Sequence, residues 1–146
     1  MKEIILAFIG SICPGILYNV EKRNLVWIGL CGMSGWITYS RFYALTGELA
    51  FSTFLGAVAV GIYSESLARL LRAPTTIFSI PGIFPLVPGI TAYSVIQYIT
   101  ERRLYEAASK GIEAVSSAGA IAFGILLTSA VFRIFKRLGK RKADPA

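Results

Sequence analysis

The stretch between Arg72 and Glu101, APTTIFSIPGIFPLVPGITAYSVIQYIT, holds 28 residues without a charged side chain. A helix that crosses a hydrocarbon layer about 30 Å thick needs roughly 20 mainly apolar residues, so this stretch is long enough to cross a bilayer. Three prolines and two glycines lie within residues 81–89. Each proline removes an amide donor and crowds the preceding turn, which excludes an unbroken helix. We predict an entry segment, an irregular Pro-Gly stretch, and then a helix from about Pro88 to Tyr98.

Uncharged stretches of 17, 17, 16 and 19 residues flank this one, three before it and one after it. The whole chain of 146 residues is 55% hydrophobic and 16% charged, whereas soluble domains carry about 25% charged residues. The pattern predicts an all-α fold: a polytopic membrane helix bundle of about five spans, with a Pro/Gly-broken fourth span. The expected spans are about 4–20, 25–40, 49–64, 77–100 and 112–132, in a single transmembrane domain of residues 1–146 with a basic C-terminal tail at 133–146.

Details of the span ends follow from local signals. The first span is expected to be a retained helix, kinked near Pro14, because no small-residue cleavage site marks it as a signal peptide. The third span is expected to continue as a helix until Pro74 stops it. Trp36 is typical of an interfacial anchor at the end of the second span. Residues 101–111 are polar and predict a loop.

The distribution of Lys and Arg predicts the orientation, since cytoplasmic loops carry an excess of both. With five spans and a cytoplasmic tail, ten basic residues lie inside and five lie outside. This favours an N-terminus outside and a C-terminus in the cytoplasm, in a cell (inner or plasma) membrane. If the Pro-rich segment is re-entrant rather than spanning, four spans remain and the N-terminus moves inside.

Several classes of chemistry are excluded by composition. The chain has no histidine, so His-dependent catalysis, haem ligation and His-containing metal sites are ruled out. Cys13 and Cys31 lie inside apolar stretches, where they are typical of small buried apolar residues rather than of a disulfide or a metal site. The sequence offers neither a nucleophile with a nearby base nor a pair of intramembrane carboxylates, so it gives no support for an enzyme. We therefore expect no enzyme, no cofactor and no nucleic-acid partner.

Two features of the second and third spans predict packing. Gly29, Gly32 and Gly35 recur every three residues and form a smooth stripe on which another helix can approach closely. Glu65 and Arg69 are four residues apart on one helix face, which favours a surface ion pair. A coupling role for Glu65 in proton or ion movement is the alternative.

The Pro-Gly stretch admits two functional interpretations. Irregular backbone at membrane depth is tolerated only inside protein or beside a wet cavity. Free amides at the start of a helix attract anions, and transporters use discontinuous helices in this way around carboxylate substrates. The stretch therefore predicts either a ligand-lined pathway or a structural hinge that contacts no ligand.

The most distinctive sequences of the chain are LYNVEKR at residues 17–23, GMSGW at 32–36, RAPTTIF at 72–78 and IPGIFPLVPG at 80–89. Together with Glu65 and Arg69 they resemble the threonine/serine exporter (ThrE) family, in particular its short YjjB-type component, equivalent to the C-terminal membrane half of a full-length exporter. The resemblance covers residues 6–135. The chain departs from the family pattern at Glu21, where many relatives have proline, and at Pro14, which the family pattern does not require.

The resemblance implies a membrane subunit of a secondary exporter of small carboxylate metabolites, either threonine and serine or a dicarboxylate such as succinate. It also implies that export is driven by the proton motive force and that a larger YjjP-like component is the partner. Five glycine-rich helices without a charge pair inside the membrane are typical of half of a transport site rather than of a complete one, because intramembrane ionisable residues usually mark coupling pathways. Instead of pairing with this partner, the chain could assemble as a homo-oligomer. The alternative function is that of an accessory protein that stabilises a partner without contacting substrate.

We assign candidate residues on this basis. The substrate pathway is expected to be lined by Pro81, Gly82, Pro85, Pro88, Gly89, Thr91 and Tyr93. The prolines and glycines would open the backbone, and Thr91 and Tyr93 would offer hydroxyls to a carboxylate or an ammonium group. Arg72 and Thr75 are expected to steer anions at the entrance, with Glu65 in the weaker coupling role.

Overall fold

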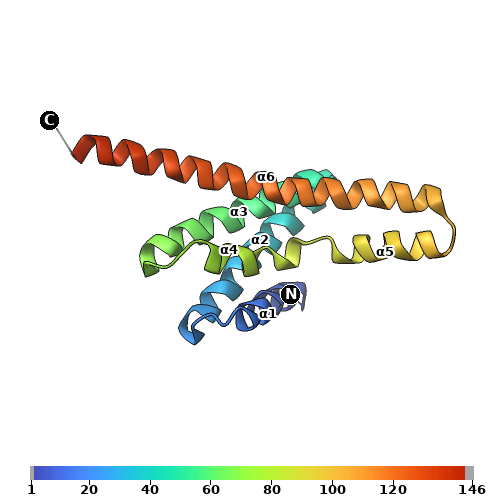
Figure 1. Cartoon of the computed structure of the whole chain (residues 1–146), viewed down its shortest axis with the longest axis horizontal. Coiled ribbons are helices and arrows are strands. Elements are labelled where there is room, and N and C mark those ends of the chain that lie inside the picture. Colours follow the sequence, from blue (N-terminus) through green and yellow to red (C-terminus); the bar gives the residue numbers. More distant parts are fainter. Residues whose placement is uncertain (1, 144–146) are drawn as a thin grey trace.

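The computed structural model describes the backbone of residues 2–143 and the side chains as far as Phe135. Its elements are α1 (Lys2–Leu17), α2 (Lys22–Thr46), α3 (Leu49–Leu71), α4 (Thr76–Gly82), the 3-10 helix η1 (Phe84–Leu86), α5 (Gly89–Thr100) and α6 (Leu104–Ala143). The described residues contain no strand, which confirms the all-helical prediction (Figure 1).

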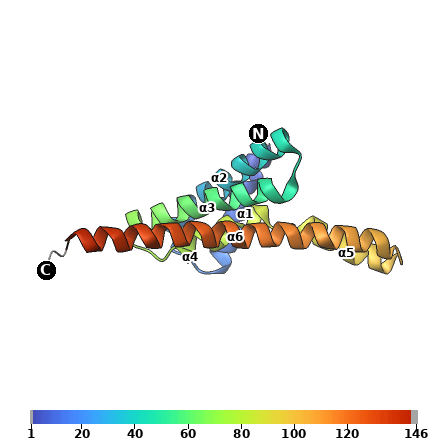
Figure 2. The same ribbon diagram turned by 90° about the horizontal axis from the view of Figure 1, so that it is seen from above.

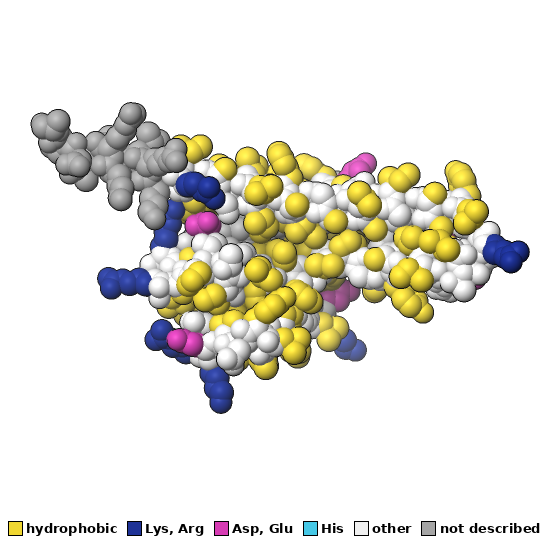
Figure 3. All heavy atoms as spheres, viewed as in Figure 1, with side chains coloured by type: hydrophobic (Ala, Val, Ile, Leu, Met, Phe, Trp, Pro, Cys, Tyr) yellow, Lys and Arg dark blue, Asp and Glu magenta, His cyan; other side chains and the backbone are white. Residues whose placement is uncertain are grey.

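Within the described residues, two helices are long and apolar enough to cross a bilayer: α3 and the part of α6 from Leu104 to Phe135. The broken segment Thr76–Leu86 with Gly89–Thr100 would be a third. Helix α1 has only 16 residues, and α2 carries charged residues near both ends. Five spans are therefore not confirmed. On the face in Figure 3, hydrophobic side chains are spread over all of the helices in view, and Lys and Arg stand mainly at its periphery.

The chain breaks where the prolines predict. The axes of the two helical pieces differ by 51° across Val87 and Pro88. Val87 is extended, with φ −63° and ψ 128°, because the ring of Pro88 disfavours a helical conformation for the residue before it. Helix α5 then starts at Gly89, within one residue of the prediction.

The entry segment α4 packs against α1, α2 and α3. Phe78 of α4 and Ile28 of α2 are fully buried in one apolar cluster. A neighbouring cluster contains Cys31, Val60 and Leu86. The burial of Cys31 confirms its prediction, whereas Cys13 is exposed. The prediction for Cys13 was wrong because an apolar stretch does not reveal which face of its helix packs against protein.

The glycine stripe of α2 accepts its neighbours as expected. A Cβ atom at Gly29 would lie 2.5 Å from the Phe8 ring of α1. A Cβ at Gly32 would overlap Ser11 of α1, and one at Gly35 would overlap Val60 of α3. The stripe therefore lets α1 and α3 pack closely on α2.

The predicted loop at 101–111 is wrong, because α6 begins at Leu104 and the turn occupies only Glu101–Arg103. Polar residues do not end a helix by themselves, and this segment is rich in helix formers such as Ala107. Arg103 pairs with Glu106 at 2.7 Å and with Glu101 at 3.3 Å. These hydrogen bonds, first to Glu106 and then to Glu101, raise the pKa of the Arg103 guanidinium.

Helix α6 is much longer than one crossing requires. Its 40 residues correspond to about 60 Å, roughly twice the hydrocarbon thickness. Figures 1 and 2 show α5 and the first half of α6 as a hairpin arm that extends beyond the other helices. No residue of α5 is buried. The basic tail continues α6 as far as Ala143, and residues 144–146 lie outside the described part.

Candidate functional site

A cavity of about 200 Å³ lies at the break between η1 and α5. It is lined by Trp36, Tyr39, Leu49, Thr53, Pro85, Leu86, Val87, Pro88, Gly89, Ile90, Thr91 and Ser117. These residues come from α2, the start of α3, the break itself and α6. The cavity exists because the prolines keep the chain from filling this space with a continuous helix.

Trp36, one of the residues that line the cavity, carries a buried hydrogen-bond donor without a partner. The indole Nε1 of Trp36 is buried and has no hydrogen-bond partner, the one such side-chain atom in the part of the chain whose side chains are described. Buried donors are nearly always paired in folded proteins, and leaving one unpaired costs about 1–3 kcal/mol. The missing partner of this atom therefore requires an explanation, and a bound molecule that accepts a hydrogen bond would provide it.

The remaining polar groups of the cavity are neutral. The Thr53 hydroxyl donates to the Leu49 carbonyl at 2.8 Å, and the Ser117 hydroxyl donates to the Glu113 carbonyl at 3.0 Å. Both oxygens can still accept a hydrogen bond. Helix α5 starts at the cavity, and its N-cap Pro88 provides no side-chain cap for the first amides. None of the described lining residues carries a charge.

A second hollow, of about 510 Å³, adjoins the cavity on the α1 side. It shares Trp36 and Pro85 with the cavity and is also lined by Glu3, Gly10 and Phe84, among others. Trp36 and Pro85 thus stand between two spaces.

The structure brings together part of the predicted pathway. Pro85, Pro88, Gly89 and Thr91 line the cavity. Pro81 and Gly82 are buried in the core instead, and a Cβ at Gly82 would lie 2.8 Å from the Cys31 sulfur. Tyr93 is 68% exposed on α5 and is absent from the cavity lining.

Sequence reasoning missed the residues that α2, α3 and α6 supply. Trp36 was expected at the membrane interface, but its Nε1 is buried beside the break. An indole nitrogen among the small residues of GMSGW was a signal that this position faces protein. The contributions of Thr53 and Ser117 had no distinct signal, since hydroxyl residues also occur elsewhere in these helices.

The predicted entrance and coupling residues share a separate hollow of about 400 Å³. Glu65, Arg72 and Thr75 line it together with Arg69 and Arg133. Glu65 lies twelve residues after Thr53 on α3, which corresponds to about 18 Å along the helix axis. The two groups of predicted residues therefore belong to different sites.

The interaction predicted between Glu65 and Arg69 does not form. The Arg69 Nη2 donates instead to the Phe132 carbonyl of α6 at 3.2 Å, and its guanidinium carbon lies 4.8 Å from the centre of the Phe132 ring. Arg69 thereby links the C-terminal half of α6 to α3.

The family model described as Threonine/Serine exporter, ThrE, matches residues 3–131. The chain belongs to the threonine/serine exporter family. The match runs from α1 into the second half of α6 and includes the whole break between α4 and α5. Membership in this family makes the chain a membrane transport component rather than an enzyme. No solved structure matches the chain.

Proposed function

We propose that this chain forms part of the substrate pathway of a threonine/serine exporter, and that the cavity at the break binds the substrate carboxylate. The observation that carries the proposal is the unpartnered Trp36 Nε1 in a residue that lines the cavity. A carboxylate accepts hydrogen bonds only, so it is a suitable partner for an indole N–H. The Gly89 amide already donates to the Val87 carbonyl, and the next amides in the first turn of α5 would supply further donors to the same group.

The size of the cavity supports a small substrate. Pockets for drug-sized ligands occupy about 300–1,000 Å³, whereas this cavity measures about 200 Å³. The hydroxyl group of threonine or serine would meet the hydroxyls of Thr53, Thr91 and Ser117. A dicarboxylate such as succinate is the second substrate class, and its other carboxylate would accept from hydroxyls of the same lining, such as those of Tyr39 and Thr91.

The proposal includes a partner, because the cavity is half of a recognition site. A charged ammonium group is best compensated by a carboxylate, and none of the described residues that line this cavity offers one. We propose that a larger YjjP-like component supplies them, with Tyr93 on the exposed face of α5 directed to the shared pathway. A proton gradient would drive export, and α1 and α2 would complete a five-span arrangement.

Efflux from cells preloaded with a threonine- or serine-containing dipeptide, or with succinate, tests the proposal. The comparison includes this chain alone, a YjjP-like partner alone, and both together. Export only with both supports a two-component exporter and identifies the substrate class. Export from the chain alone indicates a homo-oligomeric pathway. Absence of export with both proteins in the membrane contradicts the proposal and favours the accessory function.

A further inference from the structure

The hollow around Arg69, Arg72 and Arg133 has a different character from the cavity at the break. Three guanidinium groups and two hydroxyl residues, Thr75 and Ser129, line it, while Glu65 is the only acidic residue among its described lining. Guanidinium groups bind phosphate in a fork geometry with paired N–H donors. The lining is therefore suited to an anion that carries several acceptor oxygens.

The fold brings the three arginines together from α3 and α6. Arg69 is held by the carbonyl and the ring of Phe132, which occupy only part of its five N–H donors. Arg72 ends α3 in a left-handed conformation, with φ 51°, and its amide donates to the Ala68 carbonyl. Arg133 follows Phe132 directly on α6. The hollow thus lies where the C-terminal end of α3 and the α4 N-terminus meet α6, and its arginines come from two different helices.

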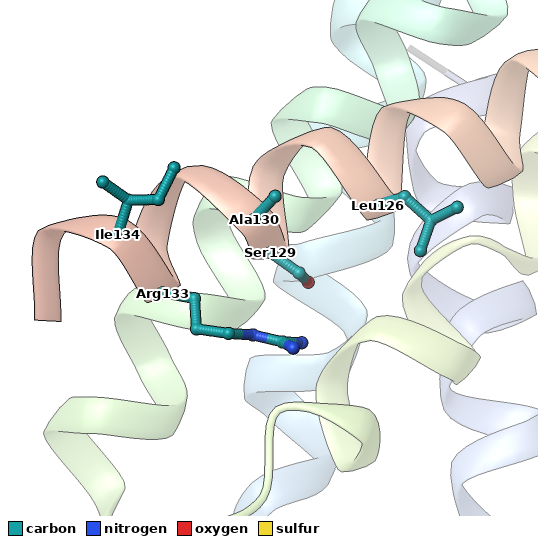
Figure 4. Close-up of a pocket in the computed structure, with 5 residues that line it drawn as sticks. All are labelled: Leu126, Ser129, Ala130, Arg133 and Ile134. Atoms are coloured by element: carbon teal, nitrogen blue, oxygen red, sulfur yellow. The ribbon is translucent and has the colours of Figure 1, made fainter. Parts of the chain in front are cut away.

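An apolar hollow of about 490 Å³ continues from the cationic one along α6. It is lined by Leu126, Ala130 and Ile134, and it shares Ser129 and Arg133 with the cationic hollow. Figure 4 shows Ser129 and Arg133 directed from the same side of α6. A ligand that occupied both spaces would need an anionic head joined to a hydrocarbon chain.

The depth of the two hollows agrees with such an amphiphile. Arg133 directly follows the uncharged stretch 114–132 on α6, and Arg72 directly follows the end of α3, so both lie where apolar helix gives way to charged residues, as at the level of lipid headgroups. Basic pockets between membrane helices bind anionic headgroups at this level. We propose that this chain binds one phospholipid with an anionic headgroup, its phosphate in the arginine hollow and an acyl chain along Leu126, Ala130 and Ile134.

The proposal is tested on the purified, delipidated full chain in a neutral detergent, by native mass spectrometry. The probes are phosphatidylglycerol and phosphatidylcholine with identical acyl chains. We expect phosphatidylglycerol to bind at least tenfold more tightly. The double variant Arg72→Gln/Arg133→Gln should lose at least tenfold of that affinity. Arg69 is left intact because it links α3 to α6.

A matched double variant, Arg23→Gln/Arg41→Gln, removes the same charge from exposed sites elsewhere and should retain the affinity of the native chain. Gel filtration and circular dichroism of each variant confirm that it is folded. Equal loss in both double variants would overturn the proposal, because it would indicate unspecific attraction. Equal affinity for the two lipids would also overturn it. So would displacement of the lipid by millimolar glycerol phosphate or inorganic phosphate, which would indicate a site for soluble anions.

Discussion

Thr91 is the hydroxyl residue of the broken segment that lines the cavity at the break. Its side chain stands in the first turn of α5, beside the amides to which we assign the substrate carboxylate. A substrate bound there would be oriented by the amides and by the hydroxyl together. Removing the hydroxyl should therefore weaken binding without removing the anion-binding end of the helix.

Thr91→Val is expected to raise the half-saturating concentration for export by roughly fivefold, the size of one net hydrogen bond. Thr100→Val is the matched control, because its hydroxyl donates to the Ile96 carbonyl on the same helix and it is exposed away from the cavity. The measurement is concentration-dependent efflux at equal membrane abundance. Equal behaviour of the two variants would exclude a substrate contact for Thr91.

Among the elements, the break between η1 and α5 shapes the cavity. Pro88→Ala restores an amide and removes the restriction on Val87, so the two helical pieces can align more closely. We expect export to fall at least tenfold while the protein remains in the membrane. Pro74→Ala, at the turn between α3 and α4, should retain export. An active Pro88→Ala exporter would show that the break is a hinge without a role in binding.

The contact between α3 and α6 depends on a glycine. A Cβ at Gly124 would lie 2.9 Å from the Ala57 Cβ and 3.0 Å from the Phe54 carbonyl oxygen. Gly124→Ala should therefore destabilise the purified protein by about 1–3 kcal/mol, as overpacking does. Gly119→Ala on the same helix meets no atom within 4 Å and should be neutral or stabilising by up to about 1 kcal/mol. Thermal unfolding in detergent measures both, and a stable Gly124→Ala protein would contradict the packing.

For the whole molecule, local signals predicted more than long-range ones did. The break was predictable because proline acts on its own turn, and the burial around Gly29 was predictable from spacing. The length of α6 was not, since the polar residues after Leu104 are compatible with either a loop or a helix. The site was half predictable. Its backbone part lies in one motif, but the place of Trp36 depends on which face of α2 packs against the break, and Arg69 finds its partner 63 residues away.

The arrangement of the helix ends supports an orientation for the whole chain. Figure 1 places the turn between α1 and α2 and the C-terminal ends of α3 and α6 toward the left. Lys22 and Arg23 follow the turn between α1 and α2, and Arg69 and Arg72 lie at the C-terminal end of α3. Because basic ends face the cytoplasm, a reporter fused after Arg141 should report the cytoplasm. A signal from the opposite side would contradict the proposed five-span orientation.

We expect the cavity at the break to bind substrate through the Trp36 indole. Trp36→Phe removes this N–H and keeps an aromatic ring, and it should raise the half-saturating concentration for export at least tenfold, since hydrogen bonds to charged groups contribute about 1.5–3 kcal/mol. Trp27→Phe is the control, because Trp27 is 37% exposed on the same helix and does not line the cavity. Concentration-dependent efflux of both variants, at equal membrane abundance, is the most direct measurement. A large loss in Trp36→Phe alone is the predicted result, and unchanged export by Trp36→Phe would contradict the account.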